Sequence, residues 1–162
     1  LWRPSHITHP PRGRYLVAIL THMRTITIHT DGGARNNPGP AGAGAVITEG
    51  ETTLKEVSKF LGTRTNNWAE YEAVIAALEE LKKLVPKTKR KEVKVNIFLD
   101  SELIARQLNG EYQIKEETLF PQFIKVHNMR VADFPNISFT HVRREQNKGA
   151  DKLANDAMDR GA

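Results

Sequence analysis

The hydrophobic pattern of this chain changes its period in a fixed order, and that order limits the possible folds more than any other feature. Residues 24–30 alternate apolar and polar side chains and are rich in β-branched residues, which predicts a strand. Residues 45–48 and 52–61 continue as second and third strands, with connections short enough for an antiparallel meander. Only after Thr65 does the apolar spacing change to the period of a helix.

The second half of the chain alternates helices and strands. The predicted long helix begins near Thr65 and ends before Pro86, with one apolar stripe formed by Trp68, Tyr71, Ile75, Leu78 and Leu81. The remaining predicted elements are a strand over 93–99, helices over 102–108 and 119–131, a strand over 137–141, and a final helix that Asn147 caps and that runs to Met158. We therefore predict an α/β fold: a mixed five-stranded sheet, with three antiparallel strands and then parallel additions, and helices on both faces.

Residues 1–22 differ from the rest of the chain. They are rich in proline, arginine and histidine and contain no acidic residue. We expect a single catalytic domain over 23–162, preceded by a flexible or vector-derived tail over 1–22; an upstream reading-frame extension is another origin. The functional alternative is a basic arm that binds nucleic acid.

Composition excludes several classes of protein. The chain has no cysteine, which excludes disulfide scaffolds, cysteine-based zinc sites and thiol catalysis. No apolar run approaches the ~20 residues of a membrane span. The formal net charge of +5 permits a polyanionic partner but does not identify one, since Arg3, Arg12 and Arg14 of the tail contribute to it. We expect a cytoplasmic monomer without membrane association.

Four acidic residues lie where a sheet-based active site would place them. Asp31 and Asp100 follow the first and fourth predicted strands, and ligand sites in α/β sheets gather at strand carboxyl ends. Glu70 and Asp151 are predicted in the first turns of the long helix and of the last helix, where the helix dipole favours a carboxylate.

Each of these acids alone has an ordinary explanation. Asp31-Gly32 is a common turn signal, and Asp100-Ser101 is a common start for a short helix. Together, however, converging carboxylates repel one another unless cations neutralise them. Oxygen ligands without cysteine suit Mg²⁺ or Mn²⁺.

Four segments, taken in order, resemble ribonuclease HI. They are Thr30-Asp31-Gly32-Gly33 with Asn37-Pro38-Gly39-Pro40, then Thr65-Asn66-Asn67-Trp68-Ala69-Glu70, then Leu99-Asp100-Ser101, and finally the run from His141 to Asp151. The resemblance covers about residues 24–160. It implies a ribonuclease H-like fold and an endonuclease that cleaves the RNA strand of RNA/DNA hybrids with divalent metals.

The resemblance also implies roles for individual residues. Asp31, Glu70, Asp100 and Asp151 would hold two Mg²⁺ ions, with Mn²⁺ as a substitute, and the products would carry 5′-phosphate and 3′-hydroxyl ends. His141 would assist proton transfer or product release; its alternative is a structural histidine at the end of a strand. The residues expected to contact the substrate are Gly32, Gly33, Asn37, Thr65, Asn66, Asn67 and Asn147. Turn formation or helix capping is an alternative role for Asn37, Thr65, Asn66, Asn67 and Asn147.

The sequence departs from the best-known bacterial pattern. Gly33 replaces a common serine, Glu102 stands where a glutamine is common, and the short region between Asp100 and His141 lacks a substrate-binding protrusion. The resemblance to family members that lack this protrusion implies double-stranded RNA as an additional substrate. Two rivals remain: another nuclease or integrase relative with the same fold, and a non-catalytic module that binds hybrids.

Overall fold

The computed structural model describes residues 23–161; the predicted tail over 1–22 lies outside the described residues. Three antiparallel strands come first: β1 (Arg24–Ala34), β2 (Gly39–Glu49) and β3 (Thr52–Arg64). The elements that follow are α2 (Asn66–Leu84), η1 (Lys87–Glu92), β4 (Val93–Leu99), α3 (Glu102–Leu108), η2 (Glu117–Leu119), α4 (Phe120–Ala132), β5 (Ile137–His141), η3 (Arg144–Gln146) and α5 (Lys148–Arg160). Among these residues no helix combines the length and the apolar character that a membrane span requires.

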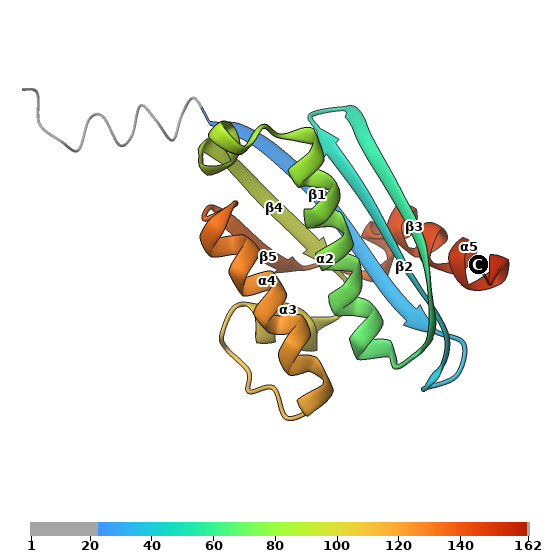
Figure 1. Cartoon of the computed structure of the whole chain (residues 1–162). Helices are drawn as coiled ribbons and strands as arrows, with labels where there is room; N and C mark the ends of the chain where they lie inside the picture. Colours follow the sequence, from blue (N-terminus) through green and yellow to red (C-terminus); the bar gives the residue numbers. More distant parts are fainter. Residues whose placement is uncertain (1–22, 162) are drawn as a thin grey trace, which may run out of the picture.

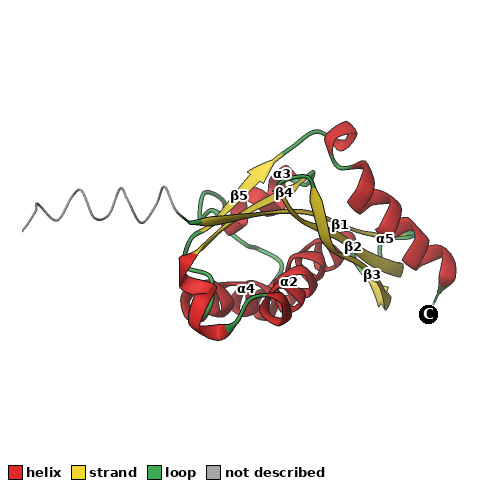
Figure 2. Cartoon of the chain, turned by 90° about the horizontal axis from the view of Figure 1, so that it is seen from above, coloured by secondary structure: helices red, strands yellow, loops and turns green. Residues whose placement is uncertain are grey.

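The sheet has the strand order β3-β2-β1-β4-β5. The pairs β3–β2 and β2–β1 are antiparallel, whereas β1–β4 and β4–β5 are parallel. Helices α2 and α4 cover one face and α5 lies on the other (Figures 1 and 2). The predicted mixed five-stranded sheet with helices on both faces is therefore confirmed.

The main core lies between the sheet and helices α2 and α4. Alternate residues of the central strands point into it, as the two-residue period of a strand requires. Its fully buried side chains include Ile26, Ile28, Ile47, Ile97 and Leu99 from the sheet, and Tyr71, Leu78 and Leu81 from α2.

Helix α5 packs unusually close to β2. A β-carbon on Gly44 would lie 2.2 Å from the carbonyl oxygen of Ala150, so only glycine permits this approach. The buried side of α5 is correspondingly small, formed by Ala150, Ala154 and Ala157. This packing sets the position of the first turn of α5, which carries Asp151.

The first three strands are longer than predicted, because β2 begins at Gly39 instead of residue 45, β3 runs to Arg64 instead of residue 61, and β1 passes its predicted end at Thr30. The segment Asp31-Gly32-Gly33 was predicted to begin a turn, but β1 continues through it to Ala34 and pairs with residues 41–44 of β2. Glycines are ordinarily poor strand formers, and here the close packing of a helix against the strand favours them. The actual turn is shorter and contains Asn36 and Asn37.

Candidate active site

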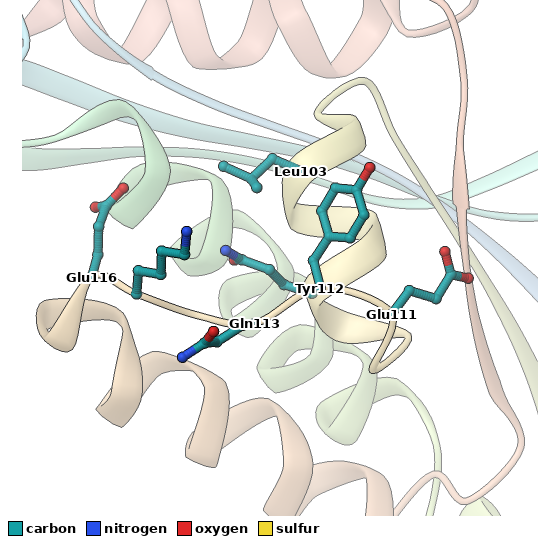
Figure 3. A pocket seen from close by; sticks show the side chains of 7 residues that line it. Leu103, Glu111, Tyr112, Gln113 and Glu116 are labelled. Atoms are coloured by element: carbon teal, nitrogen blue, oxygen red, sulfur yellow. The ribbon is translucent and has the colours of Figure 1, made fainter.

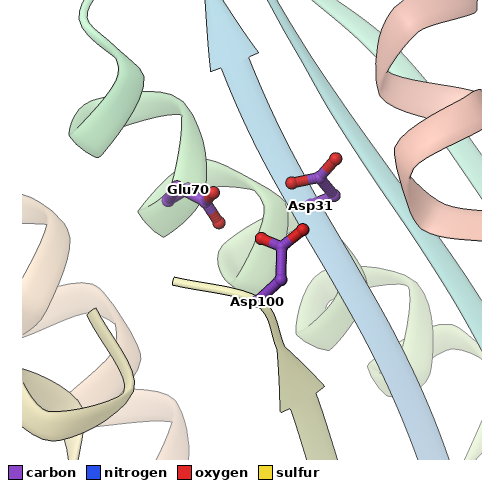
Figure 4. A group of neighbouring side chains, drawn as sticks. All are labelled: Asp31, Glu70 and Asp100. Carbon is purple, nitrogen blue, oxygen red and sulfur yellow. The ribbon is translucent and has the colours of Figure 1, made fainter. Parts of the chain in front are cut away.

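Three carboxylates meet beside the carboxyl end of β4. Asp31 of β1, Glu70 of α2 and Asp100, which follows β4, each offer an oxygen within 4.8 Å of the others (Figure 4). The parallel pairing of β1 with β4 ends at the pair Thr30–Leu99, so Asp31 and Asp100 are the next residues of neighbouring strands. The structure thus brings together three of the four acids that were predicted as metal ligands.

Gly32 lets α2 reach this point. A β-carbon on Gly32 would lie 2.2 Å from the carbonyl carbon of Ala69 and 2.5 Å from the backbone nitrogen of Glu70. No other residue fits there without moving the helix, so Gly32 has a structural role besides the predicted substrate contact. The prediction that Glu70 lies in the first helical turn is wrong: because Thr65 caps α2 and the helix begins at Asn66, Glu70 lies in its second turn.

The cluster is electrostatically strained when no cation is bound. Burial raises the pKa of Asp31 to about 8, and the nearby charges of Asp100 and Asp151 act in the same direction. Burial also raises the pKa of Glu70 well above its usual range, again reinforced by the Asp31 charge. Glu70 Oε2 is buried without a hydrogen-bond partner among the described residues. Closely spaced carboxylate oxygens, one of them buried without a partner, fit a hard divalent cation.

Asp151 stands beside the cluster, outside the three mutually close acids. It lies in the first turn of α5, as predicted, and its side chain shares a hydrogen bond with Asp31. The fourth predicted acid is therefore adjacent to Asp31 and half-buried.

His141 is the last residue of β5, at the end of the predicted strand over 137–141. The parallel register places it beside Leu99, the residue before Asp100, and its side chain is exposed. The side chain of this histidine is therefore accessible to solvent on the strand that pairs with β4.

Asn147 does not cap α5 with its side chain, which corrects the prediction. The side chain instead points into the protein, where its amide donates to the backbone oxygen of Thr30. Because Asn147 is only 1% exposed, a direct substrate contact by its side chain has no support in this geometry.

The remaining predicted substrate residues gather at the start of α2. Thr65 caps this helix by accepting a hydrogen bond from the Trp68 backbone. Asn66 accepts from the backbone N–H of Ala34, and Asn37 accepts from the backbone N–H of Asn66. These bonds join the β1–β2 turn to α2. Gly33 lies on the same stretch of β1, close to Asn66.

The chain matches the family model described as reverse transcriptase-like over residues 29–157. It is 48% identical to LC11-RNase H1, isolated from compost by a metagenomic approach; that structure matches with a TM-score of 0.80 over 85% of this chain and 98% of that one. It is 35% identical to ribonuclease HI of Halobacterium salinarum over 147 residues, which cover 89% of this chain and 70% of that protein. The chain belongs to the ribonuclease H type 1 family. LC11-RNase H1 has also been solved in complex with an RNA/DNA hybrid, at 48% identity and a TM-score of 0.76.

Some relatives in the ribonuclease H family are longer. A bifunctional protein of Mycobacterium tuberculosis is 37% identical over 139 residues, and this chain spans 36% of its length. The ribonuclease H domain is thus also found as one part of a larger protein.

No sequence pattern indicated that Glu116 would contact a predicted residue of this ribonuclease H site. Glu116 accepts a 2.6 Å hydrogen bond from the side-chain amide of Asn67. A glutamate in an exposed segment has no periodicity or spacing that points to a partner 49 positions away. Only the fold brings the two together.

Proposed function

We propose that this protein is a divalent-metal-dependent endonuclease that hydrolyses the RNA strand of RNA/DNA hybrids. The observation that carries the proposal is the cluster of Asp31, Glu70 and Asp100, the first two of them buried, within a ribonuclease H type 1 fold. A cluster of mutually repelling buried acids is costly to a fold unless it serves a cation. The hybrid complex of LC11-RNase H1 supports the choice of substrate.

Asp31, Glu70, Asp100 and Asp151 would hold two Mg²⁺ ions, or Mn²⁺ in their place. When bound, such ions supply Lewis-acid polarisation of a water and of the leaving 3′ oxygen, which fits 5′-phosphate and 3′-hydroxyl products. The carboxylates of Asp31 and Glu70 are fixed by burial, and the Gly32 backbone N–H donates to both. The chain therefore offers a preorganised set of oxygen ligands.

The other residues have roles that follow from their positions. The exposed imidazole of His141 would carry protons between the site and solvent. Asn37, Asn66 and Asn67 would contact the sugar and base edges of the substrate, where a 2′-hydroxyl distinguishes RNA from DNA, and Thr65 would contact a phosphate. Gly32 and Gly33 would allow the RNA backbone to approach the strand closely.

A cleavage assay tests the proposal. End-labelled RNA/DNA hybrid, double-stranded RNA and double-stranded DNA are each incubated with the protein in Mg²⁺, in Mn²⁺ and in EDTA, beside the Asp31→Asn variant. We expect hybrid cleavage that requires metal and Asp31, and the double-stranded RNA arm measures any additional activity. Hybrid binding without cleavage would instead identify a binding module, and cleavage in EDTA would exclude the metal mechanism.

A further inference from the structure

Hydrogen bonds to the rest of the chain fix the orientation of two asparagine amides near the site. Asn66 Oδ1 accepts from the Ala34 backbone N–H at 2.8 Å, and Asn37 Oδ1 accepts from the Asn66 backbone N–H at 3.0 Å. A backbone N–H can only donate, so the amide oxygen must face it in both cases. Both side chains therefore keep their NH₂ groups for other partners.

The side-chain amide of Asn67 is held in the opposite orientation. Its Nδ2 donates to Glu116 Oε1 at 2.6 Å. A carboxylate can only accept, so the amide nitrogen must face Glu116 and the amide oxygen must face away. Within residues 23–161, Asn67 Oδ1 accepts no side-chain or backbone hydrogen bond. Asn67 is therefore left with an unused acceptor.

Asn67 is carried by the same helix as Glu70 of the acidic cluster. Asn67 precedes Glu70 by three residues on α2, and residues with this spacing share one side of a helix. Glu116 belongs to the segment between α3 and η2, and it stands at one end of a pocket of about 440 Å³ whose other end holds Glu111 (Figure 3). The pair thus joins the start of α2 to this segment.

We propose that Glu116 is a positioning residue that holds Asn67 as a hydrogen-bond acceptor for a donor in the minor groove of the bound nucleic acid. The inference rests on the proposed function. Two donors have the required chemistry: the ribose 2′-hydroxyl, which DNA lacks, and the 2-amino group of guanine. Asn37 and Asn66 present donors to the same substrate, so the three amides differ in what they recognise.

Simple electrostatics predicts the opposite effect of Glu116. A carboxylate beside a polyanion weakens binding, so removing its charge should strengthen binding if charge were its only contribution. If Glu116 instead fixes the Asn67 amide, replacing it with glutamine should weaken binding, because a glutamine both donates and accepts and so lets the Asn67 amide pair in either orientation. The sign of the change therefore distinguishes the two explanations.

The first test is Glu116→Gln, with Glu117→Gln as the matched control because Glu117 is the next residue and is also exposed. We expect the KM for an RNA/DNA hybrid to rise about three- to ten-fold in Glu116→Gln, the effect of about one hydrogen bond, with kcat and Tm unchanged. In Glu117→Gln we expect an unchanged or lower KM. An unchanged or lower KM in both variants would overturn the inference.

A charge-conserving swap gives a second test. Asn67→Asp alone sets two carboxylates against each other and should raise KM. Adding Glu116→Gln supplies an amide that donates to the new aspartate, whose second oxygen then serves as the acceptor. We expect the double variant to recover a KM within about three-fold of the wild type. A double variant no better than Asn67→Asp alone would contradict the inference.

Modified hybrids distinguish the two donors. Single 2′-deoxy sugars in the RNA strand remove the hydroxyl at one position, and inosine in place of guanosine removes the 2-amino group. One of these changes should raise the wild-type KM at a single position and have a smaller effect in Glu116→Gln. Equal effects in both proteins at every position would overturn the inference while leaving hybrid cleavage intact, whereas a wild-type protein that cuts no hybrid in Mg²⁺ or Mn²⁺ would overturn the proposed function as well.

Discussion

The side-chain amide of Asn147 donates a 2.9 Å hydrogen bond to the backbone oxygen of Thr30, a residue 117 positions earlier in the chain. Thr30 immediately precedes Asp31, and the backbone oxygen of Asn147 accepts from the backbone N–H of Asp151. This one buried side chain therefore connects the strand that carries Asp31 to the helix that carries Asp151. It helps to set the distance between the two carboxylates.

We predict that Asn147→Ala lowers the stability of the fold and raises the Mg²⁺ concentration that hybrid cleavage requires. The variant leaves the Thr30 carbonyl without its partner, so the free energy of unfolding should fall by about 1–3 kcal/mol. The Mg²⁺ concentration for half-maximal hybrid cleavage should rise several-fold, because Asp151 is held less firmly. Asn109→Ala is the control: it removes a similar 2.9 Å bond, from Asn109 Nδ2 to the Phe139 backbone oxygen, away from the acids. An equal shift in Mg²⁺ requirement in both variants would contradict the prediction.

We predict that Gly32→Ala is strongly destabilising and that Gly33→Ala is tolerated. The new methyl group at position 32 would overlap the α2 backbone, so the free energy of unfolding should fall by about 1–3 kcal/mol or more. At position 33 the nearest atoms would be Met158 Cε at 3.7 Å and Asn66 Oδ1 at 3.8 Å, which are ordinary contacts. Urea unfolding of the two variants measures the difference. Similar midpoints would show that α2 moves away without cost.

The stability of the metal-free protein should fall as pH rises from about 4 to about 8. The pKa of Asp31 is about 8 in the folded protein and near its ordinary 3.8 in the unfolded chain, so between these values the folded state binds more protons. This contribution is complete below about pH 4 and is lost as pH rises through about 8; the raised pKa of Glu70 acts in the same direction. Thermal unfolding in EDTA at pH 5 and pH 8.5 measures the change. Added Mg²⁺ should raise Tm more at pH 8.5, and a Tm in EDTA that increases toward pH 8.5 would disprove the expectation.

Asp31→Asn should stabilise the metal-free protein while abolishing hybrid cleavage. A neutral amide removes one of the repelling charges, so at pH 8.5 in EDTA the free energy of unfolding should rise by about 1–3 kcal/mol, with little change at pH 5. Glu72→Gln is the control, because Glu72 is also buried but its carboxylate accepts from Lys59 and Gln122. That variant should lose stability and keep its activity. A loss of stability in Asp31→Asn would show that the cluster is not repulsive.

The order of the elements was predictable because the periods of the strands and helices are clear. The end of β1 was not predictable, because Asp31-Gly32-Gly33 has the composition of a turn. It forms a strand only because α2 crosses it, and that contact depends on Ala69, which lies far along the chain. Tertiary packing therefore outweighs the local turn preference in the segment that carries Asp31.

The identity of the acids could be predicted, but some of their geometry could not. The strand ends placed Asp31 and Asp100 together, as the parallel register requires. Whether Glu70 lies in the first or the second turn depends on the residue at which α2 begins. Capping residues do not specify a helix boundary to within one residue. The inward orientation of the Asn147 side chain depends on its hydrogen bond to the backbone oxygen of Thr30. Because Thr30 lies 117 positions away in the chain, no local sequence pattern predicts this bond.

The close packing of α5 on β2 has a consequence for the order in which activity develops. Because Gly44 admits the helix backbone itself, α5 reaches its native position only against a formed β2. Without that contact Asp151 is absent from its place beside Asp31, and the Asp31 carboxylate has one repelling neighbour fewer. Partly folded chains are therefore expected to be inactive as nucleases, and the arrival of the last acid coincides with the completion of the native structure.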